Sequence, residues 1–216
     1  MEQMNTGRNS EKRCEIAPEE RRSLPTRASL LLCACVFLWM IGIGYGVNLL
    51  RAYESAPGAM GLTPMVWPKE SRILRDPDRS SLLMLVHPQC SCTRASLDEL
   101  RGIMSLSHGA VRAWVLVIKP AGADEHWERS ATGAQAQAIP DVTVLPDDKG
   151  LEAARFGALT SGHVVLYDHG GRLLFSGGIT GARGHEGDNV GRRRILGLLD
   201  RSITARTGHE VFGCPL

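Results

Sequence analysis

Two cysteines separated by one residue are the part of this sequence best suited to chemistry. Cys90 and Cys92 lie in the run HPQCSCT, which begins at His87. The thiolate is the reactive form of cysteine, and it attacks disulfides and binds soft metal ions. A second thiol two residues away can attack the mixed disulfide that forms and release the product. The pattern therefore favours redox or metal chemistry over two small packed side chains.

The sequence around these cysteines predicts a strand that leads directly into a helix. Residues 81–87 form a short apolar run typical of a buried strand, and residues 93–105 carry apolar side chains at helical spacing. Cys90 and Cys92 would then lie where the helix begins. Unpaired N–H groups and the positive end of the helix dipole stabilise a thiolate at that position, so the junction favours a reactive thiol.

The rest of the C-terminal half predicts an α/β domain. Residues 111–118 are almost entirely apolar, as in a parallel strand that is buried on both faces. Residues 121–141 are expected to be a polar insertion, partly helical around residues 124–130. Further elements are expected as a strand at 142–145, a helix at 149–156, a hairpin of strands at 164–167 and 173–176, and a helix at 190–203. The resulting order is strand–helix–strand followed by strand–strand–helix.

A stretch of 23 residues without a charged side chain, Ala28–Leu50, precedes the domain. A helix that rises about 1.5 Å per residue crosses the roughly 30 Å hydrocarbon core of a membrane over this length. Because 27 residues precede this long apolar segment, an uncleaved anchor is favoured over a cleaved signal peptide. Basic residues crowd the N-terminal flank and are sparse after the span, which predicts a cytoplasmic N-terminus and an exported C-terminal domain.

These patterns divide the chain into four parts, listed from the N-terminus: a cytoplasmic tail at 1–27, a transmembrane anchor at 28–50, a tether containing proline and glycine at 51–80, and the α/β domain at 81–216. Cysteines in the four parts meet different redox conditions. Only Cys90, Cys92 and Cys214 reach the exported, oxidising side, so one thiol is left over if two of them pair.

Composition excludes several classes of protein. With 43% hydrophobic and 22% charged residues, the chain does not resemble a disordered or fibrous protein. Its 25 basic residues are nearly balanced by 23 acidic ones, so no nucleic-acid partner is expected. Six scattered cysteines are too few for a scaffold held together by disulfides.

The order of elements, with a cysteine pair at the first strand–helix junction, resembles the thioredoxin fold, with C-x-C in place of C-x-x-C. Three segments are similar to a bacterial group of membrane-tethered thioredoxin-like proteins labelled RedB, namely residues 87–96, 161–189 and 211–216. The resemblance covers residues 80–216. It implies a central mixed sheet flanked by helices, preceded by one transmembrane helix in the bacterial inner membrane, with the domain in the periplasm.

The same resemblance implies a thiol–disulfide oxidoreductase that acts on a dithiol or disulfide protein partner in the exported compartment and requires no cofactor. In the resembled fold the earlier cysteine is the exposed one. Cys90 is therefore favoured as the nucleophile and Cys92 as the resolving thiol, and the shorter spacing also allows the reverse assignment.

The sequence departs from thioredoxins just before the strand at 164–167. Thioredoxins have a cis-proline there, packed against the cysteine pair, where it helps to bind substrate peptide and keeps metals off the thiols. Here Gly162 aligns with that proline, and His163 follows. An alternative function is therefore open, a copper(I) binding or delivery module that uses Cys90, Cys92 and His163, because soft thiolates select copper(I).

Two further residues are candidates for auxiliary roles. His87 precedes the cysteines, and Pro88 after it favours a structural turn. Cys214 lies in VFGCPL, residues 211–216, which is more apolar than most chain ends. That composition favours docking of the tail, and both a third redox thiol and a lone thiol are compatible with it.

The first prediction concerns topology. A reporter enzyme that works only outside the cytoplasm, fused after Leu216, should be active, because the charge asymmetry across the span exports the C-terminal domain. The measurement is reporter activity in intact cells, compared with a reporter that works only in the cytoplasm. Activity of the cytoplasmic reporter would overturn the orientation and the assignment of cysteines to compartments.

Overall fold

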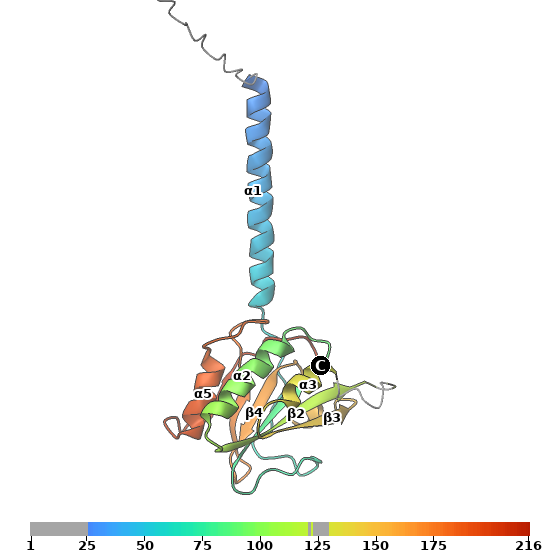
Figure 1. Ribbon diagram of the computed structural model, residues 1–216, viewed down its shortest axis with the longest axis vertical. Coiled ribbons are helices and arrows are strands. Elements are labelled where there is room, and N and C mark those ends of the chain that lie inside the picture. Colours follow the sequence, from blue (N-terminus) through green and yellow to red (C-terminus); the bar gives the residue numbers. More distant parts are fainter. Residues whose placement is uncertain (1–25, 121, 123–129) are drawn as a thin grey trace, which may run out of the picture. The chain divides into compact units, whose positions relative to one another are not determined.

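The computed structural model describes residues 26–120, 122 and 130–216 (Figure 1). The expected cytoplasmic tail lies almost entirely outside the described residues, and so does nearly all of the helix expected around residues 124–130. By its backbone contacts the chain divides into two units, residues 1–47 and 48–216.

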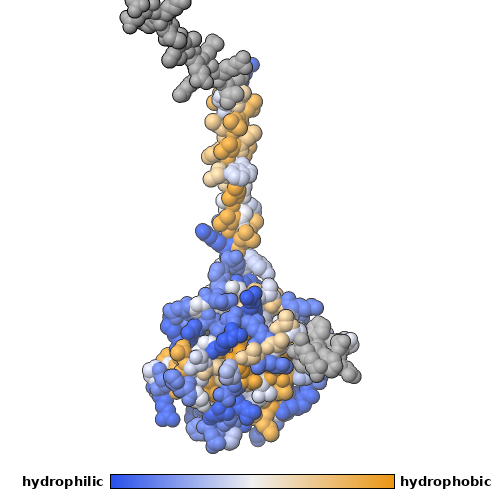
Figure 2. Space-filling view, in the orientation of Figure 1, coloured by the Kyte–Doolittle hydropathy of each residue, from blue (hydrophilic) through white to orange (hydrophobic). Residues whose placement is uncertain are grey.

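The first helix, α1, spans Thr26–Glu54 and buries none of its side chains. Apolar side chains cover most of its length (Figure 2). Among the described residues it is the one helix long and apolar enough to cross a membrane, and a membrane anchor and a signal sequence both have these properties.

The second unit is built on a sheet of six strands among the described residues, in the order β3-β2-β1-β4-β5-β6. The strands are β1 (Ser80–Val86), β2 (Val111–Lys119), β3 (Val142–Asp148), β4 (His163–Tyr167), β5 (Leu173–Gly177) and β6 (Thr207–His209). The helices are α2 (Thr93–Leu106), α3 (Ala131–Gln137), α4 (Leu151–Arg155) and α5 (Val190–Leu199).

The pairing of the strands confirms the expected fold class. The strands β1, β2 and β3 are parallel, whereas β4 is antiparallel to both of its neighbours, β1 and β5. The unit β1-α2-β2 and the hairpin β4-β5 followed by α5 are the connections of a thioredoxin-like fold. The protein thus has a mixed sheet flanked by helices, preceded by an apolar helix that could span a membrane.

Both faces of the central strands are buried, which explains their continuous apolar composition. Alternate residues of β1, such as Leu82 and Met84, pack under α2 and α5. The residues between them, Leu83 and Leu85, pack on the opposite face with Phe156. Figure 1 shows α2, α3 and α5 over one face of the sheet. A strand with a helix-covered face on each side excludes water from its whole length.

The segment expected to be an extended tether, residues 51–80, packs against the domain over much of its length. Trp67 makes edge-to-face ring contacts with Trp114, Phe156 and Tyr167 at centroid distances of 6.5, 5.1 and 5.3 Å. The Trp67 N–H also donates to the Gly171 carbonyl. The apolar rings supply the driving force, since aromatic side chains bury large areas. The prolines in this segment therefore do not make it an extended spacer.

Candidate thiol site

The cysteine pair lies in the short connection between β1 and α2, as the sequence predicted. The Cys90 N–H donates to the His87 carbonyl at 3.1 Å, and the Thr93 N–H donates to the Cys90 carbonyl at 3.1 Å. Two successive tight turns therefore bring Cys90 beside the first turn of α2. Cys92 is the N-cap residue of that helix, and its side chain makes no capping hydrogen bond. Both cysteines are thus placed at the positive end of the α2 dipole.

A third thiol completes this site. The Sγ atoms of Cys90 and Cys214 are 3.0 Å apart, although the two residues are 124 positions apart in the chain. Cys90 is only 5% exposed, whereas Cys92 and Cys214 are half-buried, so Cys90 lacks the exposure that the resembled fold gives to its earlier cysteine. Of the two interpretations of Cys214 that the sequence left open, the structure shows a docked tail with its thiol against Cys90.

The C-terminal tail, residues 211–216, is held by backbone pairing. The Ser161 N–H donates to the Cys214 carbonyl at 2.8 Å, and the Leu216 N–H donates to the Leu159 carbonyl at 3.0 Å. Between these bonds, Thr160 and Pro215 form an antiparallel bridge. The tail therefore lies like a short strand along the segment that precedes β4.

The tail approaches this segment so closely that it requires a glycine. A Cβ atom at Gly213 would lie 2.0 Å from the Ser161 carbonyl oxygen, closer than any two such atoms can approach. The preceding residues, Val211 and Phe212, are 1% and 5% exposed and anchor the tail in the domain. The position of Cys214 is therefore set on both sides.

The three thiols have different pKa values. Burial acts to raise the pKa of Cys90, but hydrogen bonds from the Cys214 thiol and from the backbone of Cys92 outweigh it and hold that pKa below its ordinary value. The hydrogen bond to Cys90, together with burial, raises the pKa of Cys214 to about 11. Burial and the charge of Cys90 raise the pKa of Cys92. The negative charge of the cluster is therefore located on Cys90.

Arg183 is a residue of the site that the sequence analysis did not single out. Its guanidinium donates to the Gly213 carbonyl through Nη1 and to the Tyr53 carbonyl through Nε. Its charge also acts to lower the pKa values of Cys92 and Cys214. The signal available in the sequence was a single arginine in the glycine-rich run 181–184, which is too common a pattern to indicate a thiol site.

His163 is placed away from thiol chemistry. Its side chain is fully buried, and its Nε2 lies 2.9 Å from the Ser176 hydroxyl. Its Nδ1 has no hydrogen-bond partner among the described residues. Burial lowers the pKa of His163 to about 4, so the ring is neutral at physiological pH. Its one hydrogen bond is thus to a hydroxyl of β5.

Gly162 does not reproduce the backbone of a cis-proline. The described residues contain no cis peptide bond, and Gly162 has a φ of 87°. Its N–H donates to the Leu85 carbonyl at 2.8 Å. Proline fixes φ near −65° and has no N–H, so it would lose both features. The glycine is required by the local backbone conformation rather than by an open pocket.

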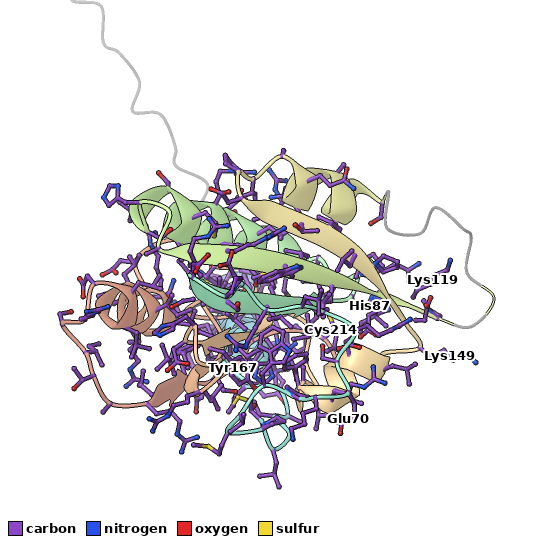
Figure 3. The ribbon with its side chains drawn as sticks, turned by 90° about the horizontal axis from the view of Figure 1, so that it is seen from below. Glu70, His87, Lys119, Lys149, Tyr167 and Cys214 are labelled. Carbon is purple, nitrogen blue, oxygen red and sulfur yellow. The ribbon has the colours of Figure 1, made fainter. Side chains whose placement is uncertain are left out.

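His87 has a structural place beside the cysteines. Its Nδ1 accepts a hydrogen bond from the Gln89 N–H at 3.2 Å, which stabilises the turn before Cys90. Its own N–H donates to the Ser161 hydroxyl at 2.9 Å, so the cysteine loop is joined to the segment that holds the tail. Figure 3 shows His87 and Cys214 on the same side of the domain.

The copper site named from the sequence, with Cys90, Cys92 and His163 as its residues, stays a prediction. Across residues 26–120, 122 and 130–216, no group of three or more histidine, cysteine, aspartate or glutamate side chains is placed to hold a metal ion. The contacts of His163 run to Ser176, and the contacts of Cys90 run to another thiol.

A cleft of about 730 Å³ opens beside Cys90, as bounded by the described residues. Its lining includes Cys90, Arg94 and Arg101, together with Thr132 and Gln135 from the α3 side. The lining is mainly polar and carries the Asp98 carboxylate, ion-paired with Arg101, as well as the Arg94 guanidinium, so it is suited to a hydrated peptide segment rather than to an apolar ligand.

Comparisons with known proteins concern the fold. No protein-family model and no curated protein matches the chain. A hypothetical protein from Sinorhizobium meliloti 1021 superimposes with a TM-score of 0.52 at 17% identity, covering 75% of this chain and 96% of that chain. An uncharacterized conserved protein from Geobacillus kaustophilus gives 0.51 at 14% identity, covering 74% and 91%. A secreted disulfide oxidoreductase from Mycobacterium tuberculosis, homologous to E. coli DsbE, gives 0.39 at 15% identity, covering 57% and 82%.

The second prediction follows from the hydrogen bond between the two thiols. In the reduced chain, alkylation of Cys90 by iodoacetamide should show a pH midpoint below the ordinary cysteine value of about 8.5. Cys214→Ala should raise that midpoint because it removes the donor, and Cys214→Ser should raise it less because the hydroxyl still donates. The measurement is the alkylation rate of Cys90 against pH by mass spectrometry. An identical midpoint in the parent chain and in Cys214→Ala would contradict the assignment.

The third prediction concerns the buried histidine. The pKa of His163 is about 4 in the folded protein and about 6.5 when exposed, so unfolding takes up a proton between these values. This contribution to stability is fully present above about pH 6.5 and is lost as the pH falls toward 4, by up to roughly 3 kcal/mol. His163→Gln should remove this part of the pH dependence of urea unfolding. The exposed control His169→Gln should keep it, and equal pH profiles for the two variants would refute the argument.

Proposed function

We propose that this chain is a membrane-anchored, exported thiol–disulfide oxidoreductase of the thioredoxin-like kind, with Cys90 as its nucleophile. One observation supports this function above the others. Cys90, at the β1–α2 junction, has a lowered pKa, and the sulfur of Cys214 lies 3.0 Å from its own. Reactivity toward disulfides follows the thiolate fraction, and release of product needs a second thiol within reach.

The reaction has two thiol–disulfide exchange steps. The Cys90 thiolate attacks one sulfur of a partner disulfide, the partner S–S bond breaks, and one partner sulfur leaves as a thiolate. A second thiol of this chain then attacks Cys90 Sγ in the mixed disulfide and releases the other partner sulfur. The partner gains two electrons and two protons, and this chain becomes oxidised by the same amount. An external dithiol reverses the change, and the same steps run backwards oxidise a partner dithiol.

The surroundings of Cys90 suit a protein partner. Arg94 and Arg101 line the polar cleft beside it, together with Asp98, which pairs with Arg101 and accepts a hydrogen bond from Gln135. A cleft with these side chains can hydrogen-bond the carbonyl groups of an extended segment. The sequence assigned the resolving role to Cys92, which lies half-buried at the N-cap of α2.

The anchored location is part of the proposal. The apolar helix α1 and the basic N-terminal flank support a single-pass anchor with the domain on the outer side of the bacterial inner membrane. Such a compartment lets disulfides persist, so a thiol enzyme there needs both a partner and an external electron donor or acceptor. The similarity to the RedB group agrees with this arrangement.

The copper(I) module stays the alternative function. Among the described residues no group of three or more histidine, cysteine, aspartate or glutamate side chains is placed to hold a metal ion. A close contact between two thiols with unequal pKa values is the arrangement that exchange chemistry uses.

The fourth prediction tests this function on the full chain in detergent. With dithiothreitol as the electron donor, the chain should accelerate reduction of insulin disulfides, which is measured by light scattering as the separated chains precipitate. Cys90→Ser should lower the rate to that of dithiothreitol alone, because no other thiol of the cluster has a lowered pKa.

Cys35→Ala provides the matched control, since it removes a thiol from α1 and leaves the site intact. Its rate should equal that of the parent chain. A Cys90→Ser variant as active as the control would rule out the proposed nucleophile.

A further inference from the structure

We infer that Cys214 is the resolving thiol of Cys90, so that the redox pair of this chain is Cys90–Cys214 rather than the C-x-C pair. The inference rests on the proposed function and assigns its second cysteine. Cys214 is carried on the C-terminal tail, residues 211–216, and its sulfur lies 3.0 Å from that of Cys90.

The geometry of the C-x-C pair favours the tail cysteine as the partner. Cys90 and Cys92 are separated by one residue inside a tight turn, where the Thr93 N–H donates to the Cys90 carbonyl. A disulfide across one residue closes a small, strained ring. Cys214 belongs to a different segment, so a bond from it to Cys90 requires no such ring. Cys92 instead contributes a backbone hydrogen bond that helps to hold the Cys90 thiolate.

The tail is built to hold Cys214 against Cys90. Backbone hydrogen bonds fix it at the Cys214 carbonyl and, on the C-terminal side, at the Leu216 N–H. On the N-terminal side, the Gly58 N–H donates to the Val211 carbonyl at 2.7 Å, and Arg183 donates to the Gly213 carbonyl. These contacts distinguish Cys214 from a lone thiol in a loose chain end.

The cleft and the tail approach Cys90 without competing for space. The described residues that line the cleft include Cys90 but no residue of the tail. Displacement at sulfur requires the attacking and leaving sulfurs on different sides of the sulfur between them. A partner sulfur bound in the cleft would therefore leave the position of Cys214 beside Cys90 unoccupied by the partner.

The electrostatics of the cluster order the two steps. The pKa of Cys214 is raised chiefly by its hydrogen bond to Cys90, with burial and the charge of Cys90 as further causes. When Cys90 has joined the partner in a mixed disulfide, it carries no charge to hold the Cys214 proton. Burial and the charge of Cys92 still raise the pKa of Cys214, and the charge of Arg183 still lowers it. Loss of the hydrogen bond to Cys90, the largest cause of the raised pKa, therefore favours attack by Cys214 after Cys90 has reacted.

The resolving step forms one S–S bond and breaks another. Cys214 loses its proton, its sulfur forms a bond with Cys90 Sγ, and the bond from Cys90 Sγ to the partner sulfur breaks. The partner sulfur leaves with the electron pair and takes up a proton. Cys90 and Cys214 are then oxidised by two electrons in total, and an external dithiol, itself becoming a disulfide, returns them to thiols.

The fifth prediction uses the full chain in detergent, with Cys14→Ser, Cys33→Ala and Cys35→Ala as a common background. The reduced chain is mixed with a deficit of 5,5′-dithiobis(2-nitrobenzoate), a disulfide that releases one coloured thiolate on attack and a second on resolution. The parent and Cys92→Ser should release both. Cys214→Ser should lose the second release, because the mixed disulfide stays on Cys90. Gly213→Val, which keeps every thiol but displaces the tail, should delay it.

The opposite pattern, with both thiolates released by Cys214→Ser and only one by Cys92→Ser, would overturn the inference. Cys90→Ser separates the two claims. Loss of the rapid first release in that variant supports Cys90 as the nucleophile whichever thiol resolves, and its persistence would refute the proposed function itself.

A second measurement needs no substitution of Cys90 or Cys214. Trypsin leaves Cys90 and Cys92 together on the peptide 80–94 and Cys214 on the peptide 207–216. After oxidation, mass spectrometry should find these two peptides joined by a disulfide, in the parent chain and in Cys92→Ser alike. A disulfide contained within peptide 80–94 would refute the assignment even if the Cys214→Ser variant failed to fold.

Discussion

The need to stabilise a thiolate on a sulfur that is almost fully buried is the constraint around which this site is organised. Burial of Cys90 by itself raises its pKa, and hydrogen bonds to the sulfur reverse that effect. The donors come from two distant places, the start of α2 and the C-terminal tail. The site therefore requires that β1, α2, the segment before β4 and the tail all be in position together.

The doubly covered sheet makes that precision possible. Side chains of β1 pack on both faces, so the loop that follows it begins from a fixed point. The same end of the sheet carries the turn at Gly162, whose N–H bonds to the Leu85 carbonyl of β1. That bond joins the segment holding the tail to the strand leading to the cysteines.

The C-terminal tail supplies a second thiol that can reach Cys90 without the strained ring of a one-residue cysteine spacing. A ring across one residue is strained, whereas a thiol brought in by tertiary structure can meet Cys90 without bending the local backbone. The glycine at position 213 and the pairing of Cys214 with Ser161 give that thiol a defined approach. The contact of Arg183 with the same tail adds a positive charge beside the cluster. Each of these features bears on the second cysteine rather than on the first.

Local pattern determined the order of strands and helices and the place of Cys90 and Cys92, because apolar runs, helical spacing and a strand–helix junction depend on near neighbours, and the fold class followed from the resemblance that this order carries. It did not determine the packing of Trp67, the β6 strand or the surroundings of His163, which arise from contacts between distant segments. The role of Cys214 is the clearest case. Composition indicated that the tail docks, but a thiol 124 residues from Cys90 finds its partner only when backbone pairing at Ser161 brings the two together. The sequence states which residues are present, but the distances between residues far apart in the chain are set only when the chain folds.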